Sequence, residues 1–187
     1  ETDLLLAIVK LIEDKLNVDE DIASVGVQII LFVENSIQFY SAILPYLYKH
    51  VFVQSRSFMT EALNEHEQML RMRGRPKILL ARNYEEAKDL YDKYKRNILG
   101  VVSDVRFERE GEIDATAGLK LASYMRSQDR FLPIILESSE EVNREASKQL
   151  AAVFINKNSK TMHLELKEAV TTTFGFGEFH FVDPDTK

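Results

Sequence analysis

The chain has 187 residues, no cysteine and a formal net charge of −6 at pH 7. Its length suits one domain, and the absence of cysteine excludes disulfides and thiolate chemistry and favours a cytoplasmic location. The negative charge, with Lys and Arg scattered along the chain, argues against a nucleic-acid surface, and no apolar run reaches the roughly 18 residues that a membrane span needs.

The N-terminal residues 1–26 are predicted to form an amphipathic helix followed by a linker. Four apolar residues recur near helical spacing over residues 3–16. They are Leu5, Ile8, Ile12 and Leu16. The polar stretch 17–24 then indicates a break. The helix is expected to pack on the following domain, to end a preceding module or to form a dimer stem, since the chain has the look of a fragment of a larger protein.

From residue 27 strands and helices alternate, which predicts a parallel sheet covered by helices on both faces, the doubly wound α/β class. The five predicted strands are Val27–Val33, Lys77–Ala81, Ile98–Ser103, Leu132–Leu136 and Ala151–Ile155. A helix follows each strand, predicted from apolar residues at helical spacing around 37–44, 87–94, 118–127, 142–150 and 164–173.

The segment 46–76 does not fit this minimal alternation. Apolar residues such as Phe58, Ala62 and Met69 recur at helical spacing, so this insertion is predicted to be helical. Pro45 is expected to bend or end the preceding helix. The many apolar groups of the insertion need either the domain's own surface or a partner.

The C-terminal residues 174–187 are predicted to be a tail or linker. Within them, the segment 174–181 alternates aromatic residues with small or polar ones, which is the period of a strand. The pattern predicts either an added edge strand or a connection to a following domain.

Polar residues follow four of the predicted strands, at the edge where open α/β sheets place their chemistry. They are Glu34 and Asn35, then Asp104, then Glu137, Ser138 and Ser139, and finally Asn156 and Lys157. Each alone has an ordinary explanation, since an Asp after a strand more often caps a helix than acts as a nucleophile. Together, the acids, the hydroxyl and the lysine predict one functional site.

These strand ends lie in segments typical of one family. The segments are Ile30–Ser36, Val101–Asp104, Leu132–Ser139 and Phe154–Lys157, with Ala81–Ala87 after the second strand. They resemble, in order, the signatures of two-component response-regulator receiver domains. The resemblance covers about residues 27–173 apart from the insertion, and it implies the flavodoxin-like fold with strand order 2-1-3-4-5.

The resemblance implies that Asp104 is a phosphoacceptor. A histidine kinase, a phosphotransfer protein or a small phosphodonor would supply the phosphoryl group. Mg²⁺ would be bound by Glu34, Asn35, Asp104 and the backbone carbonyl of Arg106, because hard oxygen ligands suit this ion. Such a domain modifies itself and is not an enzyme in the ordinary sense.

The same resemblance assigns the residues of a switch. Lys157 would hold a phosphate oxygen as a point charge. Ser138 would hydrogen-bond the phosphoryl group, and Phe154 would move with it. The change would pass to an attached or separate output domain.

Departures from the family pattern keep a second interpretation open. Asn35 replaces the Asp that most of the family has, and the loop 106–116 is longer than usual and acidic. The alternative is a pseudo-receiver that is not phosphorylated and acts as an interaction or dimerisation module. The N-terminal helix and the insertion are the candidate surfaces for a homodimer. A phosphohydrolase would need a second Asp where Arg106 stands.

Overall fold

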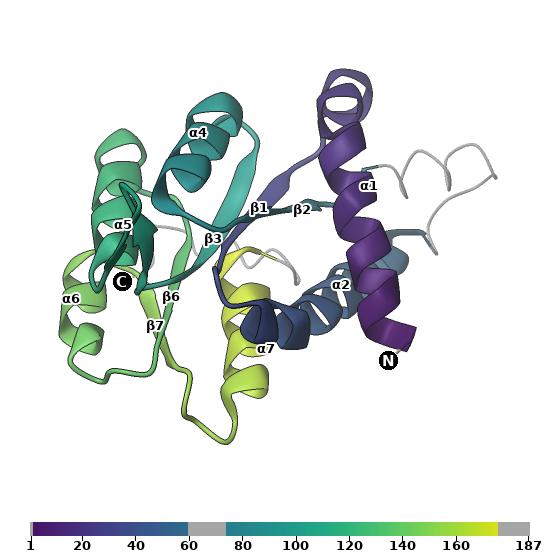
Figure 1. The fold of residues 1–187 in the computed structure, drawn as a ribbon. Coiled ribbons are helices and arrows are strands. Elements are labelled where there is room, and N and C mark those ends of the chain that lie inside the picture. The colour runs from purple at the N-terminus through teal and green to yellow at the C-terminus, as the bar shows by residue number, and fades with distance from the viewer. Residues whose placement is uncertain (1, 60–73, 176–187) are drawn as a thin grey trace, which may run out of the picture.

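The structure is a computed structural model that describes residues 2–59 and 74–175. Its centre is a five-stranded parallel sheet in the order β2-β1-β3-β6-β7 (Figure 1). The strands are β1 (Ile29–Val33), β2 (Lys77–Ala81), β3 (Ile98–Asp104), β6 (Ile134–Ser138) and β7 (Val153–Asn156). Counted along the predicted strands this order is 2-1-3-4-5, so the predicted fold is confirmed.

Six helices accompany the sheet in the described part of the chain. They are α1 (Thr2–Val25), α2 (Ile37–Met59), α4 (Tyr84–Tyr94), α5 (Ala117–Gln128), α6 (Asn143–Gln149) and α7 (Met162–Thr173). Helices α2 and α7 cover one face of the sheet, and α4, α5 and α6 cover the other (Figure 1). None of the described helices is long and apolar enough to cross a membrane.

Strand β1 shows why the central strands are apolar throughout. Ile30 and Phe32 belong to the hydrophobic cluster under α2 and α7. Leu31 and Val33 belong to the cluster under α4 and α5. Because successive side chains of a strand point to opposite faces, both sets must be apolar when helices cover both faces.

Helix α1 runs without interruption to Val25, so the predicted break at 17–24 is wrong. Val18 in this stretch is buried against the sheet. Asp21 is also buried and forms an ion pair of 2.7 Å with Lys77 on β2. The stretch is polar because it carries a carboxylate toward a buried lysine, and not because the chain leaves the helix there.

The face of α1 that packs on the domain is not the apolar face predicted from the sequence. The buried residues are Ala7, Asp14, Val18 and Asp21. The residues that marked the predicted apolar face, Leu5, Ile8, Ile12 and Leu16, are all exposed. The helix therefore packs on the domain, but through a face that includes two acids.

Asp14 joins α1 to the sheet edge. Its Oδ1 lies 2.6 Å from an Arg75 guanidinium nitrogen, and its Oδ2 accepts hydrogen bonds from the Tyr48 hydroxyl (2.9 Å) and from the backbone N–H of Ile78 (2.9 Å). Lys77 Nζ lies 3.9 Å from Oδ1. Since Ile78 belongs to an edge strand, the carboxylate also satisfies a backbone donor that the sheet leaves unpaired.

Helix α2 continues through Pro45 to Met59, so Pro45 does not end it. The helix buries Ile43 and Leu44 before the proline and Leu47 after it. This packing outweighs the cost of an internal proline, about 3 kcal/mol. The insertion is thus helical up to residue 59, as predicted, and residues 60–73 lie outside the described residues.

The polar loop predicted after β3 is a hairpin. Strands β4 (Phe107–Arg109) and β5 (Glu112–Asp114) pair antiparallel. Glu110 and Gly111 connect them with positive φ angles of 55° and 81°, which is the geometry that matches the twist of a two-residue hairpin. The strand or connection predicted for the C-terminal tail lies outside the described residues from 176 onward.

Candidate functional site

The carboxyl ends of β1, β3 and β7 bring Glu34, Asp104 and Lys157 together. Lys157 Nζ lies 2.6 Å from Glu34 Oε2 and 3.0 Å from Asp104 Oδ1. Strands β1 and β3 are neighbours in a parallel register, so Glu34, directly after β1, and Asp104, the last residue of β3, reach the same edge. One ammonium group therefore forms ion pairs with two carboxylates from different strands.

Both ends of the Lys157–Glu34 pair are held in place. Glu34 is fully buried, and the backbone N–H of Ser36 donates to its Oε1 at 2.9 Å. Burial raises the pKa of Glu34 although Lys157 opposes the shift. Burial disfavours the charged form of Lys157, but attraction to Asp104 and Glu34 outweighs it and raises the pKa. The Lys157 ammonium also lies 3.9 Å from the ring centroid of Phe39, a cation–π contact.

Asp104 is fixed by the loop that follows it. Its Oδ1 accepts a hydrogen bond of 2.8 Å from the backbone N–H of Val105. The first turn of α5 packs against this loop, and the Gly118 N–H donates to the Val105 carbonyl at 2.9 Å. A Cβ at Gly118 would lie 2.1 Å from the Asp104 carbonyl oxygen, so a side chain there would displace the loop.

Ser138, a predicted switch residue, is buried at the end of β6. Its hydroxyl oxygen accepts hydrogen bonds from Asn143 Nδ2 (2.9 Å) and from the backbone N–H of Glu140 (3.1 Å). Phe154 is half-buried, and the guanidinium carbon of Arg144 lies 4.6 Å from its ring centroid. Both predicted switch residues thus contact α6 or the turn that leads into it.

The two remaining predicted site residues are less enclosed. Asn35 follows Glu34 and is half-buried, and Arg106 is exposed in the loop after β3. Their positions in the chain place them beside Glu34 and Asp104. In the part of the chain that the structure describes, no three His, Asp or Glu side chains are grouped so as to hold a metal ion.

The sequence placed Glu137 among the strand-end residues but gave it no role of its own, although it lies next to Asp104. The two residues pair across β3 and β6. Glu137 is fully buried, and neither of its carboxylate oxygens has a hydrogen-bond partner. Burial raises its pKa to about 8, with a further contribution from Glu34 and Asp104 and against the influence of Lys157. The signal in the sequence was an acid that directly follows the apolar run of residues 132–136.

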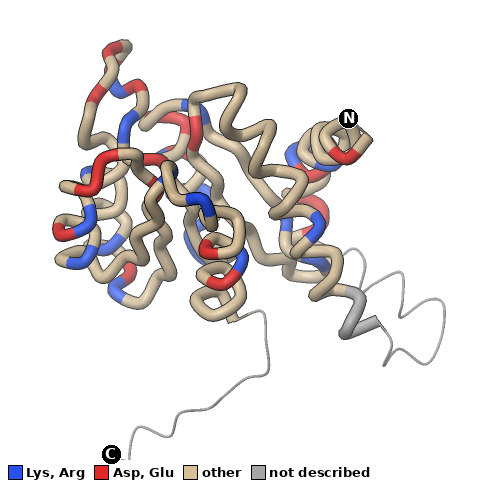
Figure 2. Tube along the Cα trace, turned by 90° about the horizontal axis from the view of Figure 1, so that it is seen from below, with Lys and Arg blue, Asp and Glu red and all other residues tan. Residues whose placement is uncertain are grey.

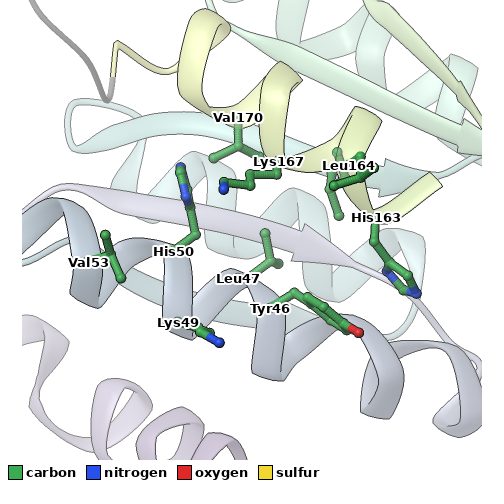
Figure 3. A pocket seen from close by; sticks show the side chains of 10 residues that line it. Tyr46, Leu47, Lys49, His50, Val53, His163, Leu164, Lys167 and Val170 are labelled. Carbon is green, nitrogen blue, oxygen red and sulfur yellow. The ribbon is translucent and has the colours of Figure 1, made fainter. Parts of the chain in front are cut away.

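A separate hollow of about 300 Å³ lies between α2 and α7, along the helices and not at the strand ends (Figure 3). Tyr46 and His163 stack at its rim, with ring centroids 4.4 Å apart. Around the rest of the domain, acidic and basic residues are interspersed along the trace (Figure 2).

Comparison with solved structures identifies the fold. The chain is similar to a response regulator receiver domain protein from Clostridium thermocellum, with 11% identity, a TM-score of 0.57 and coverage of 80% of this chain and 95% of that one. It is also similar to the signal receiver domain of an HD domain-containing protein from Pseudomonas fluorescens Pf-5, with 14% identity, a TM-score of 0.55 and coverage of 80% of this chain and 88% of that one. A third similar structure is the CheX–CheY–BeF3–Mg²⁺ complex from Borrelia burgdorferi, with 18% identity, a TM-score of 0.52 and coverage of 80% of this chain and 91% of that one. No family model and no curated protein matches. The chain has the fold of response-regulator receiver domains.

Proposed function

We propose that the chain is a signal-receiving domain that accepts a phosphoryl group on Asp104. A carboxylate oxygen of Asp104 attacks the phosphorus of a phosphohistidine in a histidine kinase or phosphotransfer protein, or of a small phosphodonor. An acyl phosphate bond forms, and the bond from phosphorus to the donor breaks. The observation that carries the proposal is the convergence of Glu34, Asp104 and Lys157 at the carboxyl edge of a sheet with receiver topology.

Mg²⁺ would be held by Glu34, Asn35, Asp104 and the backbone carbonyl of Arg106, and when bound it would supply positive charge to the phosphoryl oxygens. The donor chemistry fits, because Glu34 and Asp104 already converge on one cation, the ammonium of Lys157. Lys157 must then release Glu34 while it stays beside Asp104. The similar complex from Borrelia burgdorferi contains Mg²⁺ and BeF3, which supports this part of the proposal.

Ser138 is suited to report the modification. Its oxygen already accepts two hydrogen bonds, so the hydroxyl hydrogen remains available as a donor. A phosphoryl oxygen on Asp104 would accept a hydrogen bond from that donor, and a hydrogen bond to a charged group contributes about 1.5–3 kcal/mol. Movement of Ser138 would disturb its hydrogen bond with Asn143 at the start of α6, and through α6 the contact of Arg144 with Phe154. The changed surface would then reach an output domain or partner.

Replacing Asp104 with Asn should abolish phosphorylation. Acetyl phosphate with Mg²⁺ should add one phosphoryl group to the wild-type chain, and intact-mass spectrometry should detect no adduct on Asp104→Asn. The matched control is Asp89→Asn, which makes the same change at an exposed position on α4 and should leave the adduct in place. An adduct of equal yield on Asp104→Asn would refute the assignment of the acceptor.

Replacing Asn35 with Asp should strengthen Mg²⁺ binding by about tenfold, because it adds a negative charge beside Glu34 and Asp104. The metal-free protein should become less stable, since a third carboxylate repels the other two. Calorimetric titration with Mg²⁺ and urea unfolding measure the two effects, with Asn17→Asp on the exposed side of α1 as the control. Equal Mg²⁺ affinity in the wild type and Asn35→Asp would place residue 35 outside the metal site.

A second candidate function is that of a pseudo-receiver, an interaction or dimerisation module that keeps the fold without being phosphorylated. It is favoured by Asn35, which lacks the usual charge, and by Glu34, whose two oxygens are already bonded to Ser36 and Lys157. The same mass experiment separates the two functions. A wild-type chain without an adduct at every Mg²⁺ concentration would support the pseudo-receiver.

A further inference from the structure

Helix α1 exposes an apolar stripe on the side that faces away from its own domain. The residues of the stripe and their exposed fractions are Leu5 64%, Val9 50%, Ile12 55% and Leu16 76%. They are four, three and four positions apart, which is the spacing of the a and d positions of a coiled coil. Leu6 and Ile8 flank the stripe and are exposed as well.

The opposite side of the helix faces the domain. Ala7, Asp14 and Asp21 are buried there at intervals of seven residues. At about 100° per residue, they lie half a turn from the apolar stripe. Helix α1 stands at the periphery of the fold, beside the β2 edge (Figure 1). A second helix could therefore lie on the stripe while the two domains remain on opposite sides of the helix pair.

We propose that a second copy of this chain covers the stripe, through a parallel coiled coil of the two α1 helices. The stripe is self-complementary, because a two-fold axis parallel to α1 places each apolar residue beside its own equivalent. In this register Lys15 stands at a g position and Glu20 stands five residues later at an e position, so opposite charges flank the seam. The apolar seam ends at Leu16, because the next d position is Asp19, whose carboxylate accepts hydrogen bonds from Lys93 and Tyr94 of its own domain.

The composition of α1 argues against a membrane surface as the occupant. The helix carries six acids and two lysines. Helices that lie on membranes are instead rich in Lys and Arg on their polar face, since cellular membranes are anionic. Association that also had to order a helix would lose the conformational entropy of the chain that forms it. Here the Asp14 network already fixes α1 as a helix, so association need not order it.

The first test is the mass of the chain in solution over a dilution series by analytical ultracentrifugation. The wild type should approach twice the 21.6 kDa of the monomer at high concentration and dissociate on dilution. Ile12→Lys should raise the dissociation constant at least about 100-fold, because it buries an unpaired charge in the seam. The control Asn17→Lys lies on a different side of the helix and should dimerise like the wild type.

Circular dichroism should show the same helix content in all three proteins, since both positions are exposed in the monomer. A wild-type chain that stays monomeric, or that forms trimers, would overturn the proposal. So would Ile12→Lys that dimerises as well as the wild type. None of these readouts involves phosphorylation, so the outcome is independent of the function proposed for Asp104.

The second test fixes the direction of the helices. The chain has no cysteine, so a single introduced cysteine can form a disulfide only with the same residue of another copy. Under oxidation, Leu16→Cys should form a disulfide-linked dimer, because a parallel register places the two copies of position 16 side by side. Asn17→Cys should crosslink far less. Equal crosslinking of both variants, or none by Leu16→Cys, would overturn the parallel arrangement.

Discussion

Replacing Asp14 with Ala is expected to lower the free energy of unfolding by about 3–5 kcal/mol, because it leaves a buried cation without its partner. Arg75 is 5% exposed and would lose its ion pair of 2.6 Å. The Tyr48 hydroxyl and the Ile78 backbone N–H would lose their acceptor as well. The expected loss is a large share of the 5–15 kcal/mol that stabilises a typical domain.

Urea unfolding followed by circular dichroism measures this effect. Asp3→Ala is the matched control, because it removes an acid from an exposed position of the same helix and should change stability by less than about 0.5 kcal/mol. If the network mainly anchors α1, a first transition should appear in which the helix detaches before the sheet unfolds. A loss as small as that of the control would mean that Asp14 contributes little to holding α1.

Replacing Glu137 with Leu is expected to stabilise the protein by about 1–3 kcal/mol, because it removes a buried carboxyl group that has no hydrogen-bond partner. Leucine is similar in volume and suits a site enclosed by the apolar strands β3, β6 and β7. The gain should also depend on pH, because the carboxyl group of Glu137 titrates differently in the folded and unfolded chains.

The direction of the pH dependence follows from the pKa of Glu137. It is about 8 in the folded protein and near the ordinary value of 4.5 in the unfolded chain. Between these values the folded state binds more protons, so the stability of the wild type should fall as pH rises from about 5 to about 8. The advantage of Glu137→Leu should therefore be larger at pH 8 than at pH 5.

Urea unfolding at the two pH values tests this expectation. Glu137→Gln is the control, because it removes the titration but keeps a polar group in the cavity. It should share the flat pH profile of Glu137→Leu without its full gain in stability. An advantage of Glu137→Leu that is the same at pH 5 and pH 8 would show that Glu137 titrates near its ordinary pKa in the folded protein.

Part of the candidate site could be predicted from the sequence, and part of it could not. Sequence order placed Glu34, Asp104 and Lys157 at strand ends, and parallel strands bring such ends to one edge. That Lys157 bonds both acids at once depends on side-chain geometry across three strands. That neither carboxylate oxygen of Glu137 has a hydrogen-bond partner also depends on the positions of the neighbouring side chains in the folded chain.

The sequence by itself determined the sheet, its order and the residues at its carboxyl edge. A strand such as Ile29–Val33 is apolar at every position, and only a sheet covered on both faces accepts that pattern. The apolar residues of α1 likewise predicted a helix, as the structure confirms. These features follow from the local period of the side chains, which the sequence carries directly.

Only the tertiary structure decided which face of α1 is buried. Periodicity marks an apolar stripe, but it does not say what covers the stripe. The domain instead takes the opposite face, because Asp14 finds Arg75 and Asp21 finds Lys77, partners more than fifty residues away in the sequence. Ion pairs between distant segments leave no periodic signal, so their pairing appears only when the chain is folded.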